Sequence, residues 1–302
     1  MIRGSRRVKI LLFAAVLLSL ASATTRAQEA VKTDSALSIA PADSSFFLTS
    51  LRNKEQVDIF YKSNAYKTLR SLPLVKEAYE KIKKEMSAEN GAISKYQEFV
   101  KDKDNKELVD LLLELGVDEF FIQGGSGFKE ILNLASKINN AQSFGPLQAL
   151  LSGADPEKGQ SRAIFLALQK NLDLITIPEL VLGFRVKDRT KADNQLKRLE
   201  KILGGLSEVV AQLKNRVETK KVGESNFVTV TLDGTMIPWE DANLAQFEEE
   251  KGEFQELIKK VKGLKLTISM GVKDGYLMLG LTPSAATMEK FGSADKSLAT
   301  LA

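Results

Sequence analysis

Four carboxylates are the side chains whose type could support acid–base chemistry. Glu240 and Asp241 follow Trp239, the single tryptophan of the chain, and Asp118 and Glu119 form a second adjacent pair. Hydrolysis of a glycosidic bond requires two carboxyl groups about 5–10 Å apart around that bond, and an exposed tryptophan offers a sugar an apolar platform. Adjacency in sequence does not establish this geometry. The alternative is that Trp239 packs on the core while the two acids after it begin a helix, where the helix dipole favours negative charge.

A glycine-rich turn at residues 124–127 holds the next candidates. Its backbone N–H groups could cradle a phosphate, but it lacks the spacing of a dinucleotide-binding loop and the lysine–serine ending of a P-loop. Ser126 and Lys129 match the Ser-x-x-Lys pattern, in which a lysine one helical turn away activates a serine nucleophile. The same pattern recurs at residues 293–296, and its companion Ser-Asp-Asn and Lys-Thr-Gly motifs are absent. We therefore interpret the segment as a tight turn.

The composition excludes several kinds of catalytic site. The chain contains no histidine and no cysteine, which removes Ser-His-Asp and Cys-His machinery and the usual histidine ligands of catalytic zinc. The acidic run at residues 102–105 lacks the glycine and the closing glutamate of a calcium loop. We expect no metal and no cofactor, and enzymatic activity only through carboxylates or a serine–lysine pair.

The first 27 residues have the pattern of a secretory signal: basic residues, an apolar run at residues 10–20, then small residues up to Ala27. The run is short for a membrane span, although an uncleaved signal would anchor the chain. Removing this segment takes away five basic residues and leaves 38 basic against 39 acidic residues. Because the excess positive charge belongs to the signal, no nucleic-acid partner is expected. The sequence predicts an exported, periplasmic or extracellular protein in which residues 28–40 form a polar tether.

One long helix and several strands organise residues 162–302. Apolar residues recur at steps of three and four from Leu196 to Val217, which indicates a helix lying on a sheet. A second helix is expected over residues 244–261. Apolar or alternating runs predict strands at residues 175–184, 227–232, 266–270 and 276–281.

Residues 41–145 are expected to contain two strands, each followed by helices. Strands are expected at residues 41–51 and 117–122, where Asp-Ser-Ser-Phe-Phe-Leu and Val-Asp-Glu-Phe-Phe-Ile resemble each other, as a strand–helix duplication would explain. Pro73 is expected to begin a helix. Glycine and proline at residues 146–161 predict a hinge between the two halves, and residues 163–168 predict a further strand. The predicted fold class is α+β, a mostly antiparallel or mixed sheet covered by long amphipathic helices.

Several of these features occur together in one known family. The export signal, the tether, the Pro-Ala-Asp-Ser opening at residues 41–44 with Phe46 and Phe47, the tandem helices and the Val-Leu-Gly-Phe strand at residues 181–184 resemble a family of exported bacterial proteins of unknown function. The resemblance implies an α+β domain and export, and it supplies no catalytic residues. Members of that family are usually longer, so the chain is expected to be a short member or a fragment.

The sequence therefore predicts an exported envelope or periplasmic binding, scaffold or interaction protein without catalytic activity. Its expected partner is an envelope protein, a glycan or a lipid, and its expected contact with a membrane is through the export signal alone. Two alternatives stay open. One is a glycan hydrolase that uses Glu240, Asp241, Asp118 or Glu119, with Trp239 binding the sugar. The other is a carrier of a lipid or another hydrophobic ligand, which would need an apolar cavity between helices and sheet.

Overall fold

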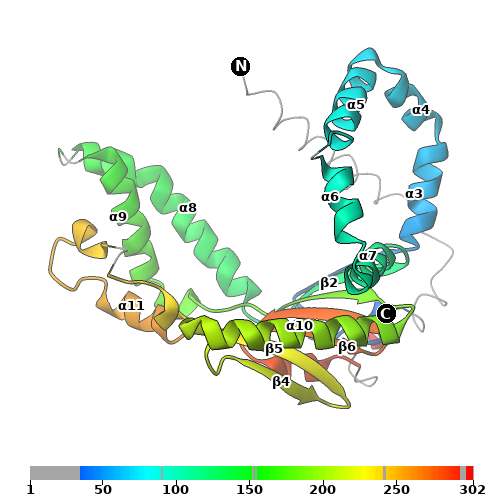
Figure 1. The fold of residues 1–302 in the computed structure, drawn as a ribbon. Coiled ribbons are helices and arrows are strands. Elements are labelled where there is room, and N and C mark those ends of the chain that lie inside the picture. The colour runs from blue at the N-terminus through cyan, green and yellow to red at the C-terminus, as the bar shows by residue number, and fades with distance from the viewer. Residues whose placement is uncertain are drawn as a thin grey trace.

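The computed structural model describes residues 35–89, 91–151, 153, 155–240, 243–292 and 297–301. Within them, seven strands form one antiparallel sheet in the order β1-β2-β3-β7-β6-β5-β4, with helices around it (Figure 1). The strands are β1 Phe46–Leu51, β2 Glu119–Gly124, β3 Leu180–Arg185, β4 Val217–Val222, β5 Ser225–Asp233, β6 Lys265–Lys273 and β7 Tyr276–Thr282. The predicted α+β fold with an antiparallel sheet is confirmed. The predicted export signal and residues 28–34 of the predicted tether lie outside the described residues.

The two faces of the sheet differ in what lies against them. Side chains alternate between the faces along each strand, and directly paired residues share a face. We call the face that carries Phe121, Met278 and Phe227 the covered face. The opposite face we call the open face.

The covered face is closed by segments from both ends of the described chain. Phe121, Phe227 and Met278 pack there with Met288 and Phe291, and none of these side chains is more than 1% exposed. The segments that close it include the short 3-10 helices Ala36–Ser38, Ala285–Lys290 and Leu298–Thr300.

Residues 35–40 belong to this core. Ala36 and Ala40 are fully buried, and the isolated bridge between Pro41 and Ser297 joins the two closing segments. The expectation that the polar tether continues to residue 40 is therefore wrong for its last six residues, because small side chains there let the backbone lie against the sheet.

Two helices cover one end of the open face. Helix α7 (Lys103–Leu115) and helix α10 (Arg189–Val209) enclose Phe184, Leu277 and Val272 with Leu111 and Ala192. Helix α10 begins where the Asp188 carboxylate accepts hydrogen bonds from two backbone N–H groups.

The predicted continuation of this helix to Val217 is wrong. Helix α10 ends at Val209, and the chain re-enters the sheet as β4. Residues 218–221 of β4 are exposed and include Glu218, Lys220 and Lys221, a composition that protects an edge strand from pairing with other chains.

A string of helices between β1 and α7 forms the first of two arms. We call it the arch: α3 (Asn53–Lys62), α4 (Asn64–Ser71), α5 (Pro73–Met86) and α6 (Ala92–Phe99). Pro73 begins α5, as predicted, and Asp102 separates α6 from α7 by capping the latter. Its two ends meet, because the N–H groups of Asn53 and Lys54 donate to the carbonyls of Asp118 and Val117 at 3.2 and 2.8 Å. None of the four helices contains a buried residue.

The second arm, which we call the hairpin, is formed by α8 (Phe128–Leu151) and α9 (Pro156–Gln169). The predicted hinge at residues 146–161 lies at the turn of this hairpin, so it joins two helices of one arm rather than two domains. The predicted strand at residues 163–168 is also wrong, since these residues belong to α9. The predicted helix over residues 244–261 is reduced to a 3-10 helix, Leu244–Phe247, and α11, Gln255–Lys262.

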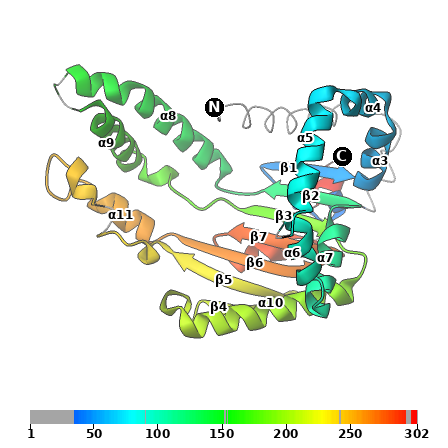
Figure 2. The ribbon, with the colours of Figure 1, turned by 45° about the horizontal axis from the view of Figure 1, so that its top comes forward.

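Both arms rise on the open-face side of the sheet (Figures 1 and 2). Phe128, at the start of the hairpin, packs edge-on against Phe46 of β1, with ring centroids 4.8 Å apart. Arg162, midway along α9, ties the hairpin to the segment before α11, because it donates to the Glu253 carboxylate at 2.7 and 3.0 Å. In the part of the chain that the structure describes, no helix has the length and apolarity needed to cross a membrane.

Candidate functional site

The tryptophan and the acids beside it do not form a catalytic pair among the described residues. The indole Nε1 of Trp239 donates to the carbonyl of Gly234 at 2.7 Å, which fixes the half-buried ring to its own chain segment. Glu240 is exposed. Asp241 lies outside the described residues.

Glu119 is the first residue of β2 and Asp118 directly precedes it, but the two side chains have different surroundings. Asp118 forms a surface ion pair with Lys187 at 3.1 Å. The Glu119 side chain is only 3% exposed, and its carboxylate accepts hydrogen bonds from the backbone of Ala36, from Thr49, Arg185 and Tyr276.

The buried Glu119 group is structural. The Tyr276 hydroxyl donates to Glu119 Oε2 at 2.6 Å, and Arg185 lies over the Tyr276 ring, 5.3 Å from its centroid. Burial raises the pKa of Tyr276, and the hydrogen bond to Glu119 raises it further. A carboxylate with four donors and almost no exposure cannot exchange protons with a substrate, so Glu119 ties residue 36 to the sheet instead.

The glycine-rich turn at residues 124–127 already holds an anion, which is a carboxylate of the same chain. Glu179 Oε2 accepts from the N–H of Ser126 at 3.3 Å, and Lys290 Nζ lies 3.0 Å from the same oxygen. A Cβ at Gly125 would lie 2.3 Å from this oxygen, so the glycine allows the close approach. The turn is therefore closed to a phosphate in this structure. Ser126 and Lys129 are both exposed, and no hydrogen bond between them is present among the described contacts.

The open face carries two rows of apolar side chains that cross the sheet. Directly paired residues make up each row. The first row is Leu48, Ile122, Leu182, Leu279 and Met270; the second is Leu180, Leu281, Ile268 and Val230. Leu48 is 61% exposed and the other eight are half-buried. They belong to none of the buried apolar clusters that the described residues form.

Both faces carry apolar side chains, since Phe121, Met278 and Phe227 form a core on the covered face, but the faces differ in polarity and in cover. An antiparallel sheet normally packs its apolar face on the core and turns its polar face to water. Here the covered face buries Thr229, Thr267, Ser269 and Thr282 at no more than 3% exposure, together with Glu119. The open face is the more apolar of the two and the less completely covered.

The arch and the hairpin stand at opposite sides of the open face, and helices beside the face carry exposed apolar side chains. Figure 2 shows β3, β7 and β6 between the arch on one side and the hairpin on the other, with α10 along the β4 edge. Leu132 on the hairpin is 68% exposed, and Ile202 on α10 is 50% exposed. We call the two open-face rows, together with α10 and the hairpin that lie beside them, the cradle.

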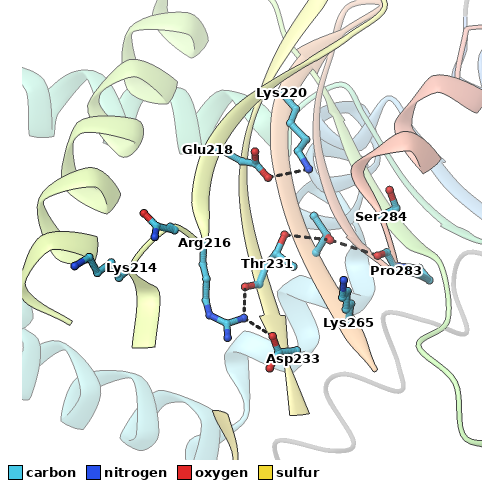
Figure 3. A pocket seen from close by; sticks show the side chains of 11 residues that line it. Lys214, Arg216, Glu218, Lys220, Thr231, Asp233, Lys265, Pro283 and Ser284 are labelled. Carbon is cyan, nitrogen blue, oxygen red and sulfur yellow. Dashed lines mark hydrogen bonds and ion pairs between the residues drawn. The ribbon is translucent and has the colours of Figure 1, made fainter. Parts of the chain in front are cut away.

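A polar pocket of about 510 Å3 lies on the covered-face side of β4, β5 and β6 (Figure 3). Its charges are largely paired: Arg216 with Asp233 at 2.5 Å, and Lys220 with Glu218 at 2.8 Å. Thr267, on its floor, donates to the carbonyl of Pro283 at 3.4 Å. The pocket offers paired charges and hydroxyl groups rather than an isolated acid or nucleophile.

Asp233 is expected to keep its negative charge to unusually low pH. The hydrogen bond from Arg216, followed by that from Thr235, lowers the pKa of Asp233 to about 2. Because the pKa is depressed in the folded protein, the pair stabilises the fold above the ordinary aspartate pKa of about 4, and this contribution is lost as the pH falls towards 2. A carbon-detected NMR titration measures the midpoint. Arg216→Gln should raise the midpoint towards the ordinary value of about 4, although the Thr235 hydrogen bonds remain, and an unshifted midpoint in the unmodified protein would refute the pairing.

Sequence reasoning missed the open face, although the strands carry a signal for it. In β6 one phase is Leu266, Ile268 and Met270, while the other begins Lys265, Thr267 and Ser269. Such alternation identifies the apolar phase, but it does not distinguish a face that fills a core from one that stays accessible. No group of histidine, cysteine, aspartate and glutamate suited to hold a metal occurs among the described residues.

Comparisons of the chain with protein-family models, with curated proteins and with solved structures find no match.

Proposed function

We propose that the protein is an exported binding protein of the bacterial envelope, which holds an apolar surface of a partner in the cradle and catalyses no reaction. Support for export comes from the charged, apolar and small segments of residues 1–27. The positions of the candidate acids favour a binding role over catalysis. Glu119 is buried in structural contacts, Asp118 pairs with Lys187, and Glu240 is exposed on a separate segment.

The incomplete cover of the open-face rows is the observation that carries the proposal. Fully covering a leucine or isoleucine side chain contributes about 1.5–3 kcal/mol. The two open-face rows hold nine such apolar side chains in a continuous surface, and surfaces of this kind mark interaction sites. A partner that covers the parts of these side chains that remain exposed would therefore bind favourably.

The cradle suits an elongated apolar partner. Its apolar rows lie on strands with helices beside them, and an amphipathic helix binds by laying its apolar face on an apolar surface. We therefore infer a protein segment with one apolar face as the partner. An acyl chain could lie along the same rows, and this carrier function is the second candidate.

Site-specific photo-crosslinking from Leu182 tests the proposal. The matched control places the same crosslinker at Leu301, which is 69% exposed and follows a segment that closes the covered face. We expect a discrete protein adduct from position 182 in the cells that make the protein and none from position 301. A lipid adduct would identify a carrier instead. Equal labelling at both positions would mean that the cradle binds nothing specifically.

A further inference from the structure

The end of the arch combines exposed apolar side chains with charges of one sign. Residues 59–76 comprise the end of α3, all of α4 and the start of α5, and we call this segment the arch tip. It contains Lys62, Lys67, Arg70 and Lys76 and no acidic residue, although Asp58 and Glu77 flank it directly. The arch tip includes the part of the arch farthest from the sheet (Figure 1).

Large apolar side chains of the arch tip face solvent. Ile59 is 70% exposed, Leu74 is 77% exposed and Leu72 is 45% exposed. The rings of Phe60, Tyr61 and Tyr66 pack on one another, with centroids 4.7–5.8 Å apart. This aromatic cluster contributes to no buried core, since α3 and α4 contain no buried residue.

The hairpin ends in an apolar surface as well. Residues 139–154 contain no charged residue, and Phe144, Leu147, Leu150 and Leu151 are 55–81% exposed. Both arms rise from the same side of the sheet (Figures 1 and 2). Two apolar ends that point to one side suit a broad surface better than a narrow pocket.

We propose that the arch tip docks on a membrane surface that contains anionic phospholipids, with the end of the hairpin as a second contact. Helices that lie in a bilayer interface bury leucine and aromatic side chains among the headgroups and keep lysine and arginine on their polar side. Each basic residue near an anionic surface contributes about 1 kcal/mol of attraction. The four basic residues of the arch tip thus complement the lipid charge while Leu72 and Leu74 enter the interface. The inference goes beyond the proposed function and does not depend on it.

Vesicle flotation tests this inference with the chain from Gln28 onward, which lacks the export signal. We expect flotation with vesicles of phosphatidylcholine and phosphatidylglycerol, and little with phosphatidylcholine alone. The double variant Lys67→Glu/Arg70→Glu should weaken binding by about tenfold or more. Its matched control is Lys197→Glu/Lys201→Glu, which makes the same charge change at two exposed positions of α10. Circular dichroism checks that both variants fold.

Insertion has a separate readout, because the chain contains no cysteine. A single Leu74→Cys substitution labelled with an environment-sensitive dye should shift its emission to the blue on anionic vesicles. Absence of binding to anionic vesicles, or equal losses in both double variants, would overturn the proposal. A protein would then be the partner that covers the arch tip. This outcome is distinct from failure of the crosslink at position 182, which concerns the cradle alone.

Discussion

Replacing Leu279 by aspartate is expected to weaken the binding of an apolar dye, 1-anilinonaphthalene-8-sulfonate, to the open face of the folded protein. Leu279 lies in the middle of the first open-face row, between Leu182 and Met270. A bound apolar molecule would then cover an unpaired carboxylate, which costs several kcal/mol, so we expect affinity to fall at least about tenfold. Dye fluorescence, titrated well below the unfolding transition, measures the effect.

The same chemical change at Leu301 is the control. Leu301→Asp should leave dye binding unchanged, because this residue lies outside the cradle. Leu279 is half-buried, so the fold should survive the substitution with a loss of about 1–2 kcal/mol in the free energy of unfolding. Full dye binding in a folded Leu279→Asp variant would show that the dye, and by extension an apolar partner, binds elsewhere.

Replacing Glu119 by alanine is expected to lower the free energy of unfolding by about 3–5 kcal/mol. Three groups donate to this carboxylate in the native structure: the buried Tyr276 hydroxyl, the Ala36 N–H and the Arg185 guanidinium. Each loses this hydrogen bond when the carboxylate is removed. Glu119→Gln should lose less, because the amide oxygen still accepts a hydrogen bond. Urea unfolding followed by circular dichroism gives the difference.

The neighbouring carboxylate provides the matched control. Asp118→Asn removes a surface ion pair with Lys187, whose side chain is 53% exposed, and such pairs contribute about 0–1 kcal/mol. A small effect at Glu119, comparable to that at Asp118, would mean that Glu119 does not hold residues 35–40 against the sheet.

The strands of the C-terminal half could be predicted because their patterns are strong. Residues 227–232, 266–270 and 276–281 alternate regularly, and each lies within a strand of the central sheet. Strand β4 was missed, since the Val-Glu-Thr-Lys-Lys-Val sequence has no apolar phase and its pairing with β5 determines its conformation. Residues 163–168 were assigned to a strand because six apolar residues in a row have no distinctive period; packing of Phe165 on Phe247 and Phe254 places them in a helix.

The candidate site could be predicted only in part, because alternation identifies two faces but not which of them is covered. The cover of the covered face comes from residues 35–41, 285–292 and 297–301, which carry no strong pattern that would place them on that face. Glu119 resembled a catalytic acid for a related reason: its partners Ala36, Arg185 and Tyr276 are 66 or more residues away. Carboxylate chemistry cannot be separated from a structural ion pair until such contacts are known.

The chain enters and leaves the arch side of the sheet at nearly the same place, so the length of this arm does not affect how the strands pair. Because Asn53 and Lys54 bond directly to Asp118 and Val117, the arch occupies the position of a turn between neighbouring antiparallel strands, and the hairpin occupies the next such position. Doubling the length of an inserted loop adds only about 0.6 kcal/mol of closure entropy. Related chains could therefore exchange, shorten or enlarge either arm while the same seven strands remain paired. The sheet would then be the inherited part of the protein, and the arms would be the parts free to diverge towards new partners.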